Sequence, residues 1–437
     1  SLTAVSLTSI WPIEKLGLEV GQTMLRTKVV DGREMGVIGG IASTSVIVIT
    51  LLAPFLGYLI FKKHLRTSLS FLLAGLVCMA SIYIGFKLPV SLSGFAWMVI
   101  ISIYVLIASG LPVWTILQPR DFINVQILYA GLAVIMLSIV VGGLHGLSTA
   151  NMPAFNLAEG RAHMGPVWPI LFIIVACGAI SGFHALVAGG TSSKQLAREP
   201  QAKVVGYGGM LLESVLAILV VLAISSSLSL ADYTLITWPS GGKGNPILAF
   251  ALSIGHLVNY SLGIPAALGS IIGILMVEGF VITTLDSAVR LNRYIFEEFW
   301  RRVLGRVPGL CKKYWFNSGL AVLLMFVLAV SNGYKLIWPV FGASNQLLSA
   351  LTLIAVSVWL NLRGKKNWFT VIPALIMLAT TVVSLLYYLF ARYIPDGNIV
   401  LATTDLILLS LSTGVVIQSL RKSFVASKAG APPAASP

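Results

Sequence analysis

The sequence predicts an all-α polytopic membrane protein with about eleven transmembrane helices. Of its 437 residues, 57% are hydrophobic and only 10% are charged, whereas about 25% of the residues of a typical soluble protein are charged. Its apolar residues gather in stretches near the 20 or so that a helix needs to cross a bilayer. This composition excludes a cytosolic enzyme, a secreted disulfide scaffold and a disordered protein.

The predicted spans are apolar stretches that reach, or nearly reach, the length of a helix that crosses a bilayer. They cover roughly residues 36–61, 69–86, 93–117, 122–142, 167–192, 205–226, 263–287, 317–340, 343–362, 368–390 and 399–420. The boundary between 317–340 and 343–362 is placed at Pro339 and Gly342 because both residues interrupt helices. Residues 143–166 and 227–262 are expected to be external loops, and the basic amphipathic stretch 288–316 is expected to lie on the inner membrane surface.

The net charge of +14 reflects membrane topology rather than nucleic-acid binding. Twenty lysines and arginines follow the first, third, fifth, seventh, ninth and last spans, and only five follow the others. Because cytoplasmic loops are enriched in cations, the richer side is cytoplasmic and so is the C-terminus.

The sequence is predicted to divide into three regions: an external or misplaced segment (1–35), a transmembrane domain (36–422) and a disordered Ala/Pro/Ser-rich tail (423–437). The first conflicts with the charge rule, since an external segment should not be rich in cations, yet it carries Lys15, Arg26, Lys28 and Arg33. Either it is a long external segment, or membrane spans that precede residue 36 are missing from this chain.

Irregular backbone inside a membrane is tolerated only where it is buried or lines a cavity, so breaks in spans indicate candidate substrate sites. The first break lies at Ser109, Gly110 and Pro112, where carbonyls near Ala108 could be free to bind a ligand. The alternative is an ordinary proline kink.

The second break is the glycine-rich run 176–194, with Ser181, Gly182 and His184 as candidate substrate contacts. His184 could bind a carboxylate or carry a proton; alternatively, it is a structural histidine. A third interruption, over 330–346, puts Asn345 at the start of a span, and interhelical hydrogen bonding is its favoured role.

Polar groups inside the spans suggest ion coupling. Glu213 is a candidate proton carrier or the partner of Lys194 or Arg120. The hydroxyls of Thr283 and Thr284 beside Asp286 could bind sodium, while the four-residue spacing of Asp286 and Arg290 favours a structural ion pair.

Motifs that mark several other classes of protein are missing from the sequence. The sequence has no Walker, HExxH or GxSxG motif and no Cys/His cluster, and Cys78, Cys177 and Cys311 are far apart. The sequence therefore predicts neither an enzyme nor a bound metal or cofactor, apart from a coupling proton or sodium ion.

Four stretches carry a resemblance to a known family: Leu111–Trp114 continuing to Gln118–Asp121, Ala176–Leu186, Gly206–Ser214 and Trp338–Gln346. In their order and sequence they resemble the carbon starvation protein A family of peptide and pyruvate transporters, over about residues 40–360. The family's N-terminal Gly-His-His and Gly-Ala-Gly-Pro segment has no counterpart in residues 1–35.

The resemblance implies a multi-pass secondary transporter of the plasma (inner) membrane that imports peptides or a small carboxylate such as pyruvate during carbon starvation. It also implies the inverted-repeat core of the amino acid–polyamine–organocation superfamily, a LeuT-like fold whose broken sixth helix would be 93–117. Independently of the resemblance, Arg120, Asp121, Arg290 and Asn345 are expected to be structural polar residues. A channel or a starvation sensor without transport activity is the alternative function.

Overall fold

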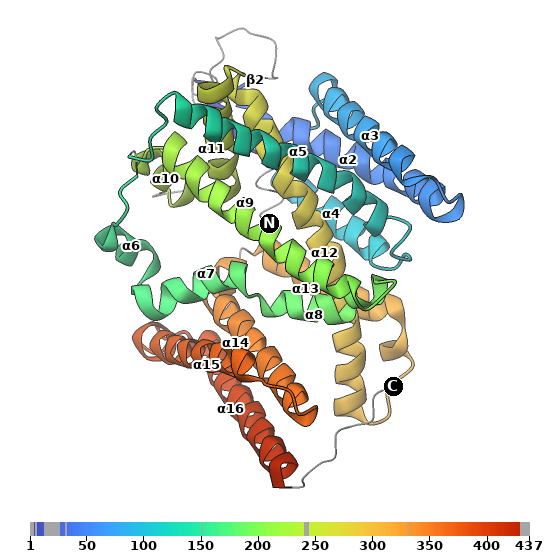
Figure 1. The fold of residues 1–437 in the computed structure, drawn as a ribbon, viewed down its shortest axis with the longest axis vertical. Helices are drawn as coiled ribbons and strands as arrows, with labels where there is room; N and C mark the ends of the chain where they lie inside the picture. Colours follow the sequence, from blue (N-terminus) through green and yellow to red (C-terminus); the bar gives the residue numbers. More distant parts are fainter. Residues whose placement is uncertain are drawn as a thin grey trace. The chain divides into compact units, whose positions relative to one another are not determined.

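A computed structural model describes residues 4, 7–12, 27–30, 33–150, 152–239, 244–331 and 333–428. The chain divides into two compact units (Figure 1). Unit 1 consists of Ser1–Ala154 and Ala197–Ser331, and unit 2 consists of Phe155–Leu196 and Asn332–Pro437. The rest of the predicted segment 1–35 and of the tail lies outside the described residues.

In its described residues, unit 1 contains eleven helical elements and a small sheet. Its helices are α2 (Ile38–Gly57), η2 (Tyr58–Lys62), α3 (Thr67–Lys87), α4 (Gly94–Ala108), α5 (Leu117–Leu144), α9 (Gln201–Ser227), α10 (Leu230–Thr237), α11 (Pro246–Leu262), α12 (Ala266–Leu304), η5 (Leu310–Lys312) and α13 (Tyr314–Val330). Strands β1 (Ile10–Pro12), β2 (Thr27–Val30) and β3 (Arg33–Val37) form an antiparallel sheet in the order β1-β3-β2, with Lys28 opposite Met35. The all-α prediction did not include this sheet.

The core of unit 1 lies where α2, α3, α5, α11 and α12 meet. Small residues let α11 and α12 approach closely: a Cβ on Gly269 would lie 2.8 Å from the Cα of Gly255, and one on Gly273 would lie 2.8 Å from the Cα of Ala251. Such contacts are typical of membrane helices, whose association depends on close packing.

Unit 2 is arranged around α14. Its elements are α6 (Leu157–Met164), η3 (Val167–Leu171), α7 (Phe172–Ala179), α8 (Gly182–Gly190), η4 (Ser192–Gln195), α14 (Gly333–Leu362), α15 (Trp368–Tyr388), η6 (Leu389–Tyr393) and α16 (Ile399–Lys428). Helices α7, α8, α15 and α16 all pack against α14. The helix α16 continues into the tail that was predicted to be disordered from residue 423.

Seven helices of the described part of the chain are long and apolar enough to cross a membrane. They are Ile38–Lys62, Thr67–Lys87, Leu117–Leu144, Gln201–Ser227, Ala266–Leu304, Val340–Leu362 and Trp368–Tyr393. Five shorter apolar helices accompany them: Gly94–Ala108, Val167–Ala176, Pro246–Leu262, Tyr314–Val330 and Ile399–Gly414. All eleven predicted stretches overlap helices of one or the other group.

Three predicted boundaries were wrong. The loop expected over 227–262 contains α10 and the largely buried α11. The turn expected around residues 339–342 is helical, because the break falls earlier, between Val330 and Gly333. The stretch after residue 288 continues α12 as far as Leu304, giving a helix of 39 residues, or about 58 Å.

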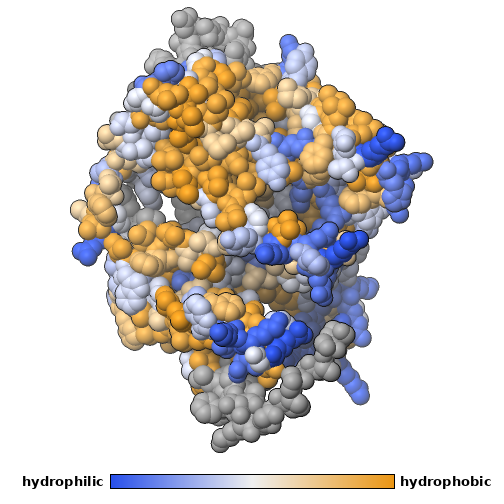
Figure 2. Space-filling view, viewed as in Figure 1, coloured by the Kyte–Doolittle hydropathy of each residue, from blue (hydrophilic) through white to orange (hydrophobic). Residues whose placement is uncertain are grey.

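The surface agrees with a membrane environment. Large hydrophobic side chains are exposed along the spans, among them Leu51, Phe55, Met79 and Val221, at 64–71%. Orange, hydrophobic residues cover much of the face shown in Figure 2. Exposed apolar surface of this extent is characteristic of a chain in contact with lipid or protein.

Candidate functional site

A buried ion pair joins two spans of unit 1. Arg120, in the first turn of α5, places Nη2 2.9 Å from Oδ2 of Asp286 in α12, and both side chains are 1% exposed. The Tyr104 hydroxyl of α4 donates to the same Oδ2 at 2.9 Å and accepts a short hydrogen bond from Arg120 Nη1. Three helices therefore meet at one charged centre.

Thr283 extends this centre to a second carboxylate. Its hydroxyl oxygen accepts a hydrogen bond from Arg120 Nη2 at 2.8 Å and lies 2.6 Å from Oδ1 of Asp121, to which it can donate. Asp121 is the more open end, since 41% of its side chain is exposed. We name Tyr104, Arg120, Asp121, Thr283 and Asp286 the charge cluster.

The charge cluster retains unused hydrogen-bonding capacity. Oδ1 of Asp286 and Nε of Arg120 have no hydrogen-bond partner among the described residues. Burying an ion pair costs desolvation energy that the attraction between the charges offsets only with good geometry. Charged residues inside membrane spans are therefore typical of functional sites.

Arg290 stabilises the break that follows α4. Residues 109–116 separate α4 from α5, and Nη2 of Arg290 donates to the carbonyl oxygens of Ala108 and Leu111 at 3.2 and 2.9 Å. The predicted break is present, but these carbonyls are not free to bind a ligand. The expected ion pair between Asp286 and Arg290 was also wrong: Arg120 takes the carboxylate, and Arg290 takes the carbonyls.

Tyr314 of α13 covers the same break. Its hydroxyl lies 3.1 Å from Oγ of Ser109, which is fully buried, and 3.2 Å from the carbonyl oxygen of Leu106. A Cβ on Gly110 would overlap the Tyr314 ring. Of the three candidate residues here, Gly110 and Pro112 are exposed and Ser109 is not.

The second predicted break separates α7 from α8 in unit 2. Ile180 and Ser181 have non-helical φ/ψ angles of −138°/77° and −86°/125°. Oδ1 of Asn345 accepts hydrogen bonds from the Phe183 amide at 2.8 Å and from the Ser181 hydroxyl at 3.2 Å. The hydroxyl of Ser349 donates to the Ile180 carbonyl oxygen at 2.7 Å.

Asn345 therefore bridges α14 to the first turn of α8. It lies within α14, which begins at Gly333, and near the start of the candidate span Val340–Leu362. Gly182 is buried at this contact, where a Cβ would lie 2.7 Å from the Ser349 amide nitrogen. His184 is exposed, on the part of α8 that follows.

The other candidates for ion coupling are not brought together. Glu213 is exposed on α9, and Arg120, one of its two expected partners, pairs with Asp286. Thr284 is exposed, and its hydroxyl donates within α12 to the Phe280 carbonyl oxygen at 2.8 Å. Only Thr283 joins Asp286 in the charge cluster, because adjacent residues of a helix point in different directions.

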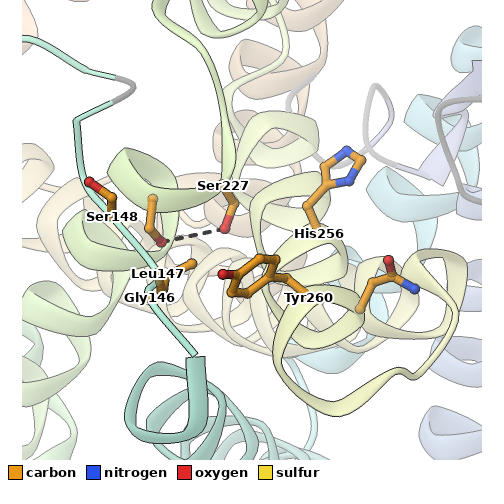
Figure 3. A pocket seen from close by; sticks show the side chains of 8 residues that line it. Gly146, Leu147, Ser148, Ser227, His256 and Tyr260 are labelled. Atoms are coloured by element: carbon orange, nitrogen blue, oxygen red, sulfur yellow. Dashed lines mark hydrogen bonds between the residues drawn. The ribbon is translucent and has the colours of Figure 1, made fainter. Parts of the chain in front are cut away.

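A separate polar pocket of about 450 Å³ opens in unit 1 (Figure 3). It is lined by Gly146, Leu147, Ser148, Ser226, Ser227, His256, Asn259 and Tyr260. The Tyr260 hydroxyl donates to the His145 carbonyl oxygen at 2.9 Å, which ties α11 to the loop after α5. The volume falls within the roughly 300–1,000 Å³ typical of small-molecule sites.

Sequence reasoning missed Tyr104, Tyr314 and His256. Tyr104 lies in the predicted span 93–117 and Tyr314 in the stretch 288–316 that was expected on the membrane surface. Neither belongs to a motif, so only the fold reveals their partners. His256 lies in α11, which was predicted to be loop. Asn245, whose side chain accepts a hydrogen bond from the Leu248 amide at 3.0 Å, followed by Pro246, is a helix-start signal that could have revealed α11.

The chain forms many apolar helices, has backbone breaks after α4 and after α7, and buries the charged pair of Arg120 and Asp286. These features define a multi-pass helical membrane protein. The chain belongs to the carbon starvation protein CstA family, whose model matches residues 4–245 and 240–384. The family resemblance deduced from the sequence motifs is thereby confirmed.

Relatives of the chain are transporters. It is 29% identical over 342 residues to the peptide transporter CstA of Helicobacter pylori, covering 66% of this chain and 49% of that protein. It is 30% identical over 370 residues to the pyruvate/proton symporter BtsT of Escherichia coli, covering 66% and 50%. The chain spans about half the length of these curated relatives, and no solved structure shows significant similarity to it.

Proposed function

We propose that the protein is a secondary active transporter that imports peptides or a small carboxylate such as pyruvate by ion-coupled alternating access. The observation that carries the proposal is the buried pair of Arg120 and Asp286 beside the Arg290-held break after α4. Buried ionised groups beside a helix interruption are typical of transporter sites. The transporter names of relatives point to the same class of protein.

Proton coupling fits the charge cluster better than sodium coupling. The guanidinium of Arg120 lies against both Thr283 and Asp286, so a sodium ion there would meet a fixed positive charge. A proton exchanged at Asp286 or Asp121 would instead alter the pairing with Arg120. Under this proposal His184 contacts the substrate carboxylate or relays protons, and Glu213 carries a proton.

The polar pocket between the loop after α5, the end of α9 and α11 is proposed as the external entrance for substrate. Its hydroxyl, amide and imidazole groups can hydrogen-bond to a carboxylate or to the backbone of a short peptide. The predicted topology places the ends of α5 and α9 that border it on the external side. A LeuT-like inverted repeat, with the break after α4 in its sixth helix, remains part of the proposal.

Uptake by proteoliposomes tests the proposal. Labelled dipeptide and labelled pyruvate are offered separately under an imposed proton gradient, and then under a sodium gradient. Saturable accumulation that a protonophore abolishes is expected. Uptake that follows only the substrate gradient without saturation would indicate a channel, and no uptake of either substrate would favour a sensor.

Two substitutions test the assigned roles. His184→Ala and Glu213→Gln should each reduce coupled uptake, whereas Glu199→Gln, at an exposed carboxylate between η4 and α9, should leave it unchanged. Uptake that is normal in both test variants would remove these roles while leaving transport itself established.

A further inference from the structure

A carboxyl group without a hydrogen-bond partner is buried in unit 2, in the last helix. Asp405 of α16 is 0% exposed, and neither of its carboxylate oxygens has a hydrogen-bond partner among the described residues. The family match ends at residue 384, so it assigns nothing to this position. The charge cluster, which lies in unit 1, does not use it.

The surroundings of Asp405 are apolar and aromatic. Its helix packs against α14, α15 and η6, with Val340 and Leu401 forming a buried cluster with Tyr393. The rings of Tyr388 and Tyr393 stack with centroids 5.8 Å apart, and both lie close enough to interact electrostatically with Asp405. The Tyr393 hydroxyl is also buried without a partner.

No cation faces this carboxyl group from the described parts of the packed elements. The titratable groups near it are Tyr388 of α15 and Tyr393 of η6, and Arg392 of η6 is exposed. From Trp338 to Leu362, α14 carries no Asp, Glu, His, Lys or Arg. No described side chain would therefore compensate the negative charge of an ionised Asp405.

An unpaired carboxylate in such surroundings is far less stable than the neutral acid. A metal cation would neutralise it only with several further oxygen ligands, and the neighbours that interact with it supply two phenol groups. A proton meets the requirement alone. We propose that Asp405 is a proton-binding site, neutral at rest, that exchanges its proton with water at the start of α16.

Asp405 lies six residues after Ile399, where α16 begins, or about 9 Å along the axis. The exchange breaks the carboxyl O–H bond, water accepts the proton and a carboxylate remains; no other bond changes. The predicted topology puts this end outside, where an imported proton would enter. The use of the Asp405 proton for coupling rests on the proposed function, whereas the proton-binding site itself does not.

Infrared difference spectroscopy of the full chain in lipid tests the site. Between about pH 5 and pH 9, the wild type should show a protonated-carboxyl carbonyl band that shifts in heavy water and is lost as the pH rises. The band should be missing from Asp405→Asn and from Asp405→Leu, the second variant suiting the apolar surroundings if the first does not fold. Spectra that match between wild type and both variants, or a band that does not shift, would overturn the proposal.

Uptake measurements separate this proposal from the proposed function. If the Asp405 band titrates but the wild type takes up neither substrate, the proton site stands and the transport proposal fails. If the wild type accumulates substrate and no Asp405 band is found, the proton site fails alone. Loss of pH-dependent uptake in Asp405→Asn, with Glu199→Gln normal, would support both.

Discussion

Arg120 and Asp286, 166 positions apart in the sequence, form an ion pair with an N–O distance of 2.9 Å in which each side chain is 1% exposed. The pair joins the first turn of α5 to the middle of α12, and Tyr104 connects it to α4. Because the surroundings exclude water, each charge depends on the other for compensation. Removing one partner should therefore cost more than removing both.

We expect Arg120→Met and Asp286→Leu each to destabilise the protein by about 3–5 kcal/mol, since each leaves a buried charge unpaired. The double variant should be less destabilised than either single variant. Thermal unfolding in detergent, followed by the loss of the monodisperse peak, measures the difference. Arg161→Met, at an exposed arginine of α6, is the control and should change stability by less than about 0.5 kcal/mol.

Strictly additive effects of Arg120→Met and Asp286→Leu would contradict the ion pair as the energetic unit. The uptake assay adds a second test. If the charge cluster serves only stability, the folded double variant should transport normally; if it takes part in coupling, uptake should lose its dependence on the proton gradient.

The contact between α8 and α14 requires a glycine at position 182. A Cβ there would overlap the Asn345 carbonyl oxygen and lie 2.6 Å from Cβ of Leu348. Gly182→Ala should therefore destabilise the protein by about 1–3 kcal/mol. Gly178→Ala is a matched control in α7, since nothing lies within 4 Å of a Cβ at that glycine. Equal melting temperatures for the two variants would show that this contact is not close-packed.

Most of the helices could be predicted because length and hydropathy are local properties of a sequence. Three helices, α6, α10 and α11, lie in stretches that were predicted to be loops. The longest of them, α11, has only 17 residues and carries His256 and Asn259, so it does not satisfy a search for long apolar spans. It is nevertheless buried, because Gly255 lets α12 pack closely against it. Close packing of this kind depends on a partner element that local hydropathy does not identify.

The charge cluster was only partly predictable for a similar reason. Spacing along one helix favours Arg290 as the partner of Asp286, and the sequence offers no means of ranking that pair against Arg120. The fold decides between them by bringing α5 against α12. The breaks at residues 110 and 181 were predictable from glycine and proline, but the groups that satisfy their backbone, Arg290 and Asn345, came only from the structure.

Arg290 should be replaceable by lysine more readily than by an apolar residue. Both of its hydrogen bonds, to the carbonyls of Ala108 and Leu111, come from the single atom Nη2, so one lysine nitrogen could make both. Arg290→Met should cost about 1–3 kcal/mol by leaving the carbonyls unsatisfied, and Arg290→Lys should recover much of this loss in thermal unfolding.

The control for Arg290 is Arg301→Met, at an exposed position of the same helix. It should leave the melting temperature nearly unchanged. If Arg290→Lys is as unstable as Arg290→Met, the guanidinium plane itself is required, and the two carbonyl contacts are not the main contribution of this side chain.

If the pocket between the loop after α5, α9 and α11 is the substrate entrance, residues at its rim should control substrate entry. Ser148 is exposed at the rim, so Ser148→Trp should narrow the opening without disturbing the packed core. We expect KM for the transported substrate to rise about tenfold, equivalent to about 1.4 kcal/mol, with little change in melting temperature. Thr149→Trp places the same side chain on the next exposed residue, which does not line the pocket, and should leave KM unchanged. Equal KM values for the two variants would exclude the pocket from the substrate path, because both carry the same added bulk and differ only in where it lies.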